Sequence, residues 1–229
     1  MKNIINIKNI NYTIPYGKTI LHDVSLEVKS GEFIGILGRN GSGKTTLLDI
    51  LQGLRPATSG AIVVLDEDPA DGSRNHLHLI TTLSHDANIK GSLTVEQYLK
   101  FYSSFYDNYM YEEESKLIDF FSLIKTSKVG TLSTGQMKKM QFIGAVCAKP
   151  ILLLIDEVTA VMDPETRDQF FNVIQDHRQR YGLTIVIATN IAEDLVGRVD
   201  RVLFIDDGRA LESKPEDLLK LFNVEKKAC

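Results

Sequence analysis

The chain has 229 residues, of which 43% are hydrophobic, so it is long and apolar enough to fold around a substantial core. Its formal net charge of -4 arises from interspersed acidic and basic residues, which argues against a nucleic-acid-binding protein. Cys147 and Cys229 lack metal-ligand spacing, and neither a signal-peptide cleavage site nor an apolar stretch of roughly 20 residues is present. We therefore expect a cytosolic protein in which the cysteines form neither a disulfide framework nor a zinc site.

The first part of the chain predicts antiparallel strands. Isoleucines alternate with polar residues over residues 1–14, and the apolar stretches "VSLEV" and "FIGILG" flank the turn-forming "KSGE". A helix is expected from Lys44, and it should end near Gly53 because glycine is typical of helix ends. "GAIVVL" and "NHLHLITTL" predict two further strands.

A mostly helical stretch is expected over residues 86–149. Aromatic residues recur at helical spacing between residues 98 and 109, and Thr94 with Gln97 forms the capping-box pattern that starts a helix. We interpret this aromatic stripe mainly as core, with contact surface as the alternative. Another helix is expected directly after Gly135.

Buried strands alternate with helices in the last third of the chain. "ILLLID" and "LTIVIATN" are near-continuous aliphatic runs typical of buried parallel strands, and Asp163 with Pro164 predicts the start of a helix between them. "RVLFIDDGRALE" predicts a hairpin and "PEDLLKLF" a terminal helix. The chain is therefore expected to form one α/β domain, with residues of about 1–85 and 150–229 as its core and residues of about 86–149 as an inserted helical subdomain.

"GRNGSGKT" matches the phosphate-binding pattern G-x-x-x-x-G-K-[ST], and it stands between a predicted strand and a predicted helix as that motif requires. Its glycines allow backbone N–H groups to surround a phosphate, and the helix start adds partial positive charge. Lys44 is expected to reach the outer phosphates of a nucleoside triphosphate, and the Thr45 hydroxyl to bind magnesium. The expected nucleotide contacts in this loop are Gly38, Arg39, Asn40, Gly41, Ser42, Gly43, Lys44, Thr45 and Thr46.

Two adjacent acids end the apolar run "ILLLIDE". An aspartate at the carboxyl end of a strand can hold hydrated magnesium, and a neighbouring glutamate can orient or deprotonate the attacking water. We assign these roles to Asp156 and Glu157. Strands often end in a solvated acid, so the assignment depends on the phosphate-binding loop that accompanies it.

"LSTGQ", residues 132–136, precedes a predicted helix and stands ahead of Asp156. With this element the sequence resembles the ATP-binding cassette ATPases, whose signature is Leu-Ser-x-Gly-Gln at this place. The resemblance covers nearly the whole chain. It implies a P-loop fold with an antiparallel β subdomain, a mostly parallel core sheet and an inserted helical subdomain.

The resemblance also implies which residues meet the nucleotide. In a head-to-tail dimer, Mg²⁺-bound ATP would lie between the phosphate loop of one cassette and the signature of the other. Tyr16 is placed like the family's adenine-stacking aromatic residue, with Tyr12 as the alternative. The remaining expected contacts are Ser133, Gly135, Gln136 and Asp163.

The same resemblance implies an ATP-hydrolysing subunit of a membrane transporter, peripheral on the cytoplasmic face of the membrane. Its partners would be integral permease subunits and a second cassette in a homodimer or heterodimer. The pattern "SLTVEQYLKFYSSFY" favours the ATPases of exporters. The alternatives are a soluble cassette ATPase and a slowly hydrolysing ATP sensor.

Two positions depart from the family pattern. His85 stands where the family usually has a glutamine that senses magnesium and water, and Asn190 stands where it has a switch histidine. A neutral imidazole can still bridge water and metal in one tautomer, so His85 remains a candidate catalytic and magnesium-contacting residue. Asparagine cannot carry positive charge toward the γ-phosphate. We therefore expect slow hydrolysis, unless a neighbouring side chain or a different partner cassette completes the site.

Overall fold

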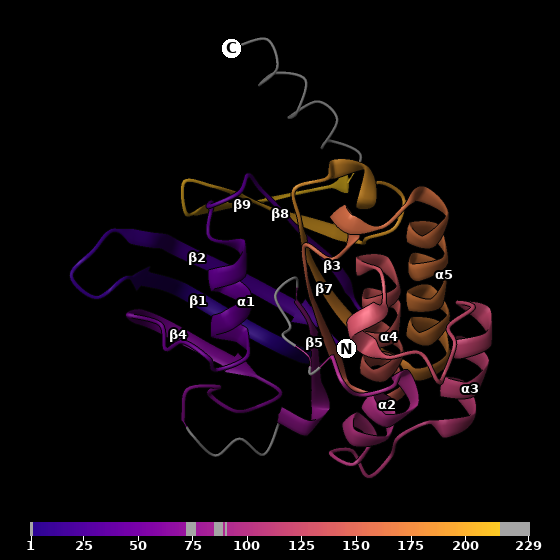
Figure 1. Cartoon of the computed structure of the whole chain (residues 1–229). Coiled ribbons are helices and arrows are strands. Elements are labelled where there is room, and N and C mark those ends of the chain that lie inside the picture. The colour runs from indigo at the N-terminus through magenta and orange to yellow at the C-terminus, as the bar shows by residue number, and fades with distance from the viewer. Residues whose placement is uncertain (1, 72–76, 85–88, 90, 216–229) are drawn as a thin grey trace. The chain divides into compact units, whose positions relative to one another are not determined.

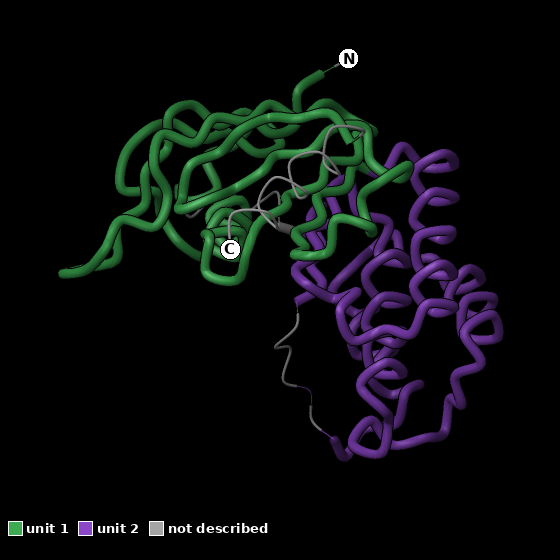
Figure 2. The backbone as a smooth tube through the Cα atoms, turned by 90° about the horizontal axis from the view of Figure 1, so that it is seen from above, with its two compact units in different colours: residues 1–76, 184–229 green, residues 77–183 purple. Residues whose placement is uncertain are grey.

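The computed structural model describes residues 2–71, 77–84, 89 and 91–215, and it begins with three strands, whereas three α-helices follow one another in the middle of the chain (Figure 1). The chain forms two compact units, which are described separately (Figure 2). The first unit comprises residues 1–76 and 184–229, and the second comprises residues 77–183.

A three-stranded antiparallel sheet forms part of the first unit. β1 (Asn3–Thr13) lies between β2 (Thr19–Lys29) and β4 (Ser59–Val64). Buried and exposed residues alternate in β2, with Val24, Leu26 and Val28 turned inward. Such alternation is the pattern of a sheet with one covered face, so the prediction of antiparallel strands is confirmed here.

Four more strands in the first unit follow the order β7-β3-β8-β9. β3 (Phe33–Leu37) is parallel to both β7 (Thr184–Thr189) and β8 (Arg201–Asp206), and β9 (Arg209–Ser213) completes the predicted hairpin. β3 and β7 are buried throughout, as expected for parallel strands covered on both faces. The interpretation of β2 and β3 as neighbouring antiparallel strands is therefore wrong, because a fully buried strand does not belong in a sheet with a solvated face.

Helix α1 (Lys44–Leu51) follows β3 and the phosphate-binding loop. It buries Leu47, Leu48 and Leu51, and Gly53 follows its end with a left-handed φ of 72°. The predicted start and stop of this helix are thus confirmed.

Within its described residues, the second unit combines two parallel strands with four α-helices. β5 (Ile80–Leu83) pairs with β6 (Leu152–Asp156) and confirms a strand at the end of "NHLHLITTL", whereas Leu77–Leu79 just before it form a short 3₁₀ helix. Phe142 lies between Phe121 and Phe170, with ring centroids 6.0 and 4.3 Å away, and joins three helical segments in one aromatic core. The helices are α2 (Val95–Ser103), α3 (Tyr111–Phe120), α4 (Thr134–Cys147) and α5 (Pro164–Tyr181).

The predicted aromatic stripe does not form one helix face. α2 begins with the predicted capping box but ends at Ser103, before Tyr109. Its buried face is formed by Val95, Leu99 and Ser103, whereas Phe101 is 59% exposed. The stripe is therefore divided between core and surface: Tyr109 is buried and the other tyrosines of the stripe are half-buried, whereas Phe101 and Phe105 are exposed.

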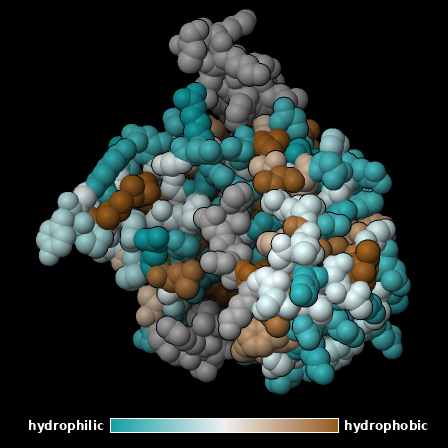
Figure 3. All heavy atoms as spheres, viewed as in Figure 1, coloured by the Kyte–Doolittle hydropathy of each residue, from teal (hydrophilic) through white to brown (hydrophobic). Residues whose placement is uncertain are grey.

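No helix within the described part of the chain is long and apolar enough to cross a bilayer. On the face shown in Figure 3, apolar side chains form small groups separated by polar ones. The predicted terminal helix begins at Pro215 and otherwise lies outside the described residues, as does Cys229. Cys147 is a buried free thiol at the end of α4.

Candidate nucleotide-binding site

The phosphate-binding loop is organised around the side chain of Lys44. This side chain is only 3% exposed, and its Nζ donates hydrogen bonds of 2.9 Å to the carbonyl oxygens of Gly38 and Arg39. The Ser42 N–H donates to the Arg39 carbonyl at 3.2 Å and closes the loop. The ammonium group therefore lies inside the loop, where it can meet a phosphate oxygen.

Two glycines give this loop its shape. Gly43, the residue before α1, has a left-handed φ of 111°, and no side chain caps the helix. A Cβ atom on Gly38 would lie 2.3 Å from the Ile205 carbonyl oxygen, so only glycine lets the backbone pass there. The first turn of α1 carries no acidic residue, so no carboxylate of this turn competes with an anion for the helix N-terminus. These features fit a triphosphate.

The two predicted acidic residues follow β6 in the second unit. β6 is buried along its whole length, and Asp156 at its end is 9% exposed. Glu157 is half-buried and has a left-handed φ of 50°, a conformation that costs a non-glycine residue energy and is often found at functional sites. A carboxylate pair at the end of a buried strand suits a hydrated divalent cation and a polarised water.

Ser133 and Gln136 form a capping box at the start of α4. Ser133 Oγ accepts the Gln136 N–H at 3.2 Å, and Gln136 Oε1 accepts the Ser133 N–H at 2.9 Å. Because the serine oxygen acts as an acceptor in this box, its O–H hydrogen can still be donated to a ligand. A Cβ atom on Gly135 would meet nothing within 4 Å, so the surface beside Ser133 is open.

Backbone hydrogen bonds between residues 129–130 and residues 91–93 form a seam just before the signature segment, residues 132–136. The Val129 N–H donates to the Leu93 carbonyl at 2.8 Å, and the Gly130 N–H to the Gly91 carbonyl at 3.0 Å. The two glycines touch closely, because a Cβ atom on Gly91 would lie 3.1 Å from the Gly130 Cα. The seam holds the chain two residues before Leu132 against the segment that leads into α2.

The family model described as ABC transporter matches residues 21–160, more than half of the chain. The chain belongs to the ABC transporter family. Among its relatives is the energy-coupling factor transporter ATP-binding protein EcfA1 of Streptococcus mutans, 31% identical over 95% of this chain and 84% of the relative. The methionine import ATP-binding protein MetN of Rhizobium johnstonii is 33% identical over 86% of this chain, which spans 57% of that protein.

Solved structures agree with this assignment. The fold matches CbiO1 of Clostridium perfringens, described as part of the ABC transporter complex CbiONQ, with a TM-score of 0.81 and 25% identity over 99% of this chain and 94% of that one. An ATP-binding subunit of an ABC transporter matches with a TM-score of 0.84 at 22% identity, over 96% of this chain and 93% of that one. The predicted P-loop, ABC-type α/β fold is thus confirmed, and the protein is an ABC ATPase that binds and hydrolyses ATP.

The two candidate adenine-stacking residues of this ABC ATPase differ in accessibility. The Tyr16 side chain is fully exposed, in a turn where its own φ is 58°. Tyr12 is 9% exposed, and Arg55 donates to its hydroxyl at 3.2 Å. Of these two tyrosines, only Tyr16 has a ring face that is accessible for stacking, so the geometry favours Tyr16 as the adenine-stacking residue.

The loop after β7 contacts the phosphate-binding loop directly. Asn190 Nδ2 donates to Asn40 Oδ1 at 3.0 Å, and both residues are exposed. Arg39, Gly41 and Thr45 are exposed as well, whereas Thr46 is half-buried. His85 lies outside the described residues, so its role stays a prediction.

Asp163 has a structural function in addition to its predicted one. It caps α5, because its two carboxylate oxygens accept the Thr166 N–H at 2.9 Å and the Thr166 hydroxyl at 2.7 Å. The hydrogen bonds from the Thr166 backbone and side chain hold the pKa of the Asp163 carboxyl below its usual value. The helix start predicted from Asp163 and Pro164 is confirmed.

Lys138 is a residue of the signature helix that the sequence interpretation did not single out. It is 3% exposed, and its Nζ donates to the Ser84 carbonyl at 2.7 Å. Ser84 directly precedes His85. A lysine among the apolar positions of α4 was the available signal, since buried lysines need a polar partner.

Proposed function

We propose that this chain is the ATP-hydrolysing subunit of a membrane transporter and works as one of a pair of cassettes. The observation that carries the proposal is the phosphate-binding loop, with Lys44 held inside it at the uncapped start of α1. ATP supplies the γ-phosphoryl group that is transferred to water. The loop backbone and Lys44 bind and orient its phosphates, while Tyr16 stacks on the base.

The acidic residues after β6 supply the chemistry in this proposal. Asp156 and the Thr45 hydroxyl hold Mg²⁺, with His85 as a further contact. Glu157 orients the attacking water and accepts its proton. These assignments rest on the character of each side chain together with membership of the ABC family.

Ser133 is proposed to contact the nucleotide bound by a partner cassette. Its Oγ already accepts the Gln136 N–H, so its O–H is directed by the ligand rather than by the capping box. The α4 N-terminus and Gly135 add backbone polarity without steric hindrance. ATP between two such surfaces stabilises the pair, and hydrolysis weakens it.

Asn190 is proposed to slow hydrolysis. Its amide is bound to Asn40 in the phosphate-binding loop and carries no positive charge, so it stabilises developing phosphate charge less than a histidine would. We expect Asn190→His to accelerate single-turnover hydrolysis, with Asn190→Ala as the control for loss of the amide. A histidine variant no faster than wild type would contradict this assignment.

The transporter itself is proposed to contain separate permease subunits, with this chain on their cytoplasmic side. The expectation of an exporter rested on one helical pattern, whereas a named relative is a methionine import protein. We therefore propose uptake as the direction of transport to test first. The division near residues 85 and 150 into core and helical subdomain also remains a proposal.

The test combines turnover with association. Purified full-length wild type should release phosphate from ATP and Mg²⁺, and Lys44→Ala should abolish this release. Glu157→Gln should bind ATP without turnover and accumulate a dimer in light scattering. A Glu157→Gln protein that stays monomeric at saturating ATP, with every candidate partner supplied, would refute the paired-cassette proposal. Dimerisation of the wild type without turnover would instead indicate an ATP sensor.

A further inference from the structure

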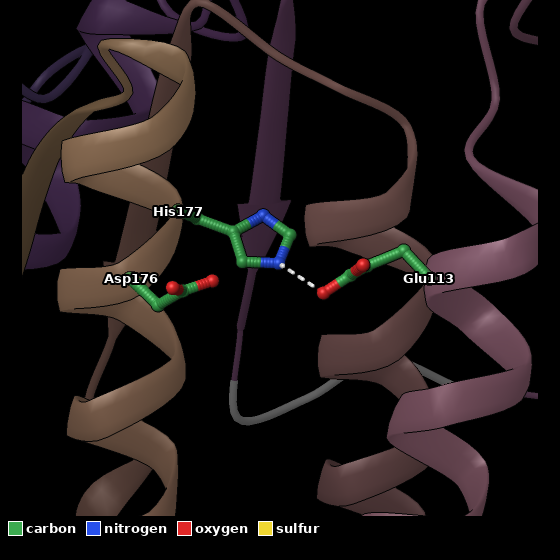
Figure 4. A group of neighbouring side chains, drawn as sticks. All are labelled: Glu113, Asp176 and His177. Atoms are coloured by element: carbon green, nitrogen blue, oxygen red, sulfur yellow. Dashed lines mark ion pairs between the residues drawn. The ribbon is translucent and has the colours of Figure 1, made fainter.

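Helices α3 and α5 of the second unit bring three potential metal ligands together (Figure 4). Glu113 lies in α3, and Asp176 and His177 are consecutive residues of α5. Each offers one ligand atom, and these atoms lie within 4.8 Å of one another. Side chains from two helices thus converge on one point.

The buried imidazole of His177 points to a ligand there. His177 is 2% exposed, and its Nε2 has no hydrogen-bond partner among the described residues. Figure 4 shows this nitrogen facing Glu113, with 3.7 Å between Nε2 and Oε1, which is longer than a hydrogen bond. A buried, unpaired nitrogen is destabilising unless a further group binds it.

Arg180 neutralises the two carboxylates in the metal-free arrangement. Its Nη1 lies 2.7 Å from Asp176 Oδ2 and 3.3 Å from Glu113 Oε1, and Lys116 Nζ lies 3.7 Å from Glu113 Oε2. The Arg180 side chain is 44% exposed and also rests on Tyr181, with its Nη2 2.6 Å from the Tyr181 hydroxyl. It can therefore leave the carboxylates and keep its place on the tyrosine. Breaking its pair with the half-exposed Asp176 costs little, whereas the Glu113 side chain is 10% exposed and needs the bound cation to replace the guanidinium charge.

The ligand set determines which ions fit. One imidazole nitrogen and two carboxylate oxygens suit Zn²⁺ and similar first-row divalent ions, whereas Ca²⁺ prefers six to eight oxygens. Ligand atoms around tetrahedral zinc lie about 3.4 Å apart, so the three side chains must close by roughly 1 Å. Asp176 is exposed and can adjust by rotamer change. Solvent-open grooves of about 540 and 370 Å³ border Glu113 and give an ion access.

We propose that Glu113, Asp176 and His177 bind a zinc-like divalent cation that joins α3 to α5 and displaces the guanidinium of Arg180. The fourth position is filled by water. This site shares no residue with the predicted magnesium site, and it stabilises the unit that carries the signature segment.

The experiment titrates ZnCl₂ into chelator-treated, full-length protein without nucleotide, using calorimetry and thermal melting. We expect one zinc per chain, a raised Tm, and the visible spectrum of tetrahedral Co²⁺ after cobalt substitution. Glu113→Gln and His177→Gln should each weaken binding at least about tenfold. Arg180→Met should tighten it by removing the competing cation, and this variant retains all three ligands.

Glu112→Gln, on an exposed neighbouring position of α3, is the matched control and should bind zinc like wild type. The proposal is overturned if folded wild type and Arg180→Met both fail to bind zinc at millimolar concentration. It is equally overturned if zinc binds but the affinity is unchanged in His177→Gln, since the ion then lies elsewhere. Circular dichroism verifies that each variant is folded.

Discussion

Ser133 allows helix capping to be separated from nucleotide contact. Ser133→Ala removes the acceptor for the Gln136 N–H, an exposed bond of 3.2 Å, and should cost about 1 kcal/mol. For a chain of this size, that cost lowers Tm by about 2–4 °C. Ser133→Asp keeps a capping acceptor and adds negative charge at the helix start, which is favourable by about 0.3–1 kcal/mol. The expected order of thermal stability, from highest to lowest, is therefore Ser133→Asp, wild type and Ser133→Ala.

The expected order for ATP-dependent dimerisation is different. In a Glu157→Gln background, Ser133→Ala loses a hydrogen bond to a charged group, about 1.5–3 kcal/mol, which weakens the dimer at least about tenfold. Ser133→Asp loses the hydrogen-bond donor and also places a carboxylate against phosphate, so its ATP-dependent dimer should be the weakest of the three. Thermal melting and light scattering with ATP measure the two orders. A Ser133→Asp protein that dimerises as well as its parent would refute the contact between Ser133 and nucleotide.

Three further predictions concern the first unit. Gly38→Ala should abolish ATP binding while the protein stays folded, because its Cβ would lie 2.3 Å from the Ile205 carbonyl oxygen; wild-type affinity in a binding assay would contradict this. Tyr16→Ala should weaken ATP binding roughly tenfold through lost base stacking, with Tm unchanged, and unchanged nucleotide affinity would rule out the stacking role. For Glu32, burial raises the pKa, but hydrogen bonds from Arg201 and the Lys29 N–H outweigh burial and hold it below the ordinary 4.5. The stabilisation from charged Glu32 should therefore be present above pH 4.5 and lost as the pH falls further, so urea unfolding of Glu32→Gln and wild type should differ most near neutrality and converge in acid.

Local patterns in the sequence were sufficient for much of the fold. The loop before Lys44, the capping box at Thr94 and the Asp163-Pro164 helix start depend on residues that are close in the sequence. Their geometry is set by short-range sterics and hydrogen bonds, and it was predicted correctly.

Long-range packing was the part that the sequence did not reveal. The aromatic spacing continued past Ser103, whereas helix α2 ends at Ser103. Val95 and Leu99 occupy the buried face of this helix. The hydrogen bond between Asn190 and Asn40 joins positions 150 residues apart, and no local pattern indicates it. Such contacts form only when the intervening strands have assembled into the folded structure.

The seam between Gly91 and Gly130 has a mechanical consequence. The two backbones touch without intervening side chains, and hydrogen bonds at 2.8 and 3.0 Å fix their register. We therefore expect a displacement of the chain ahead of α2 to move Leu132 as well, because no flexible side chains lie between the two backbones. A methyl group at either glycine would push the two backbones apart, and it would loosen their connection without altering any residue proposed to contact ATP.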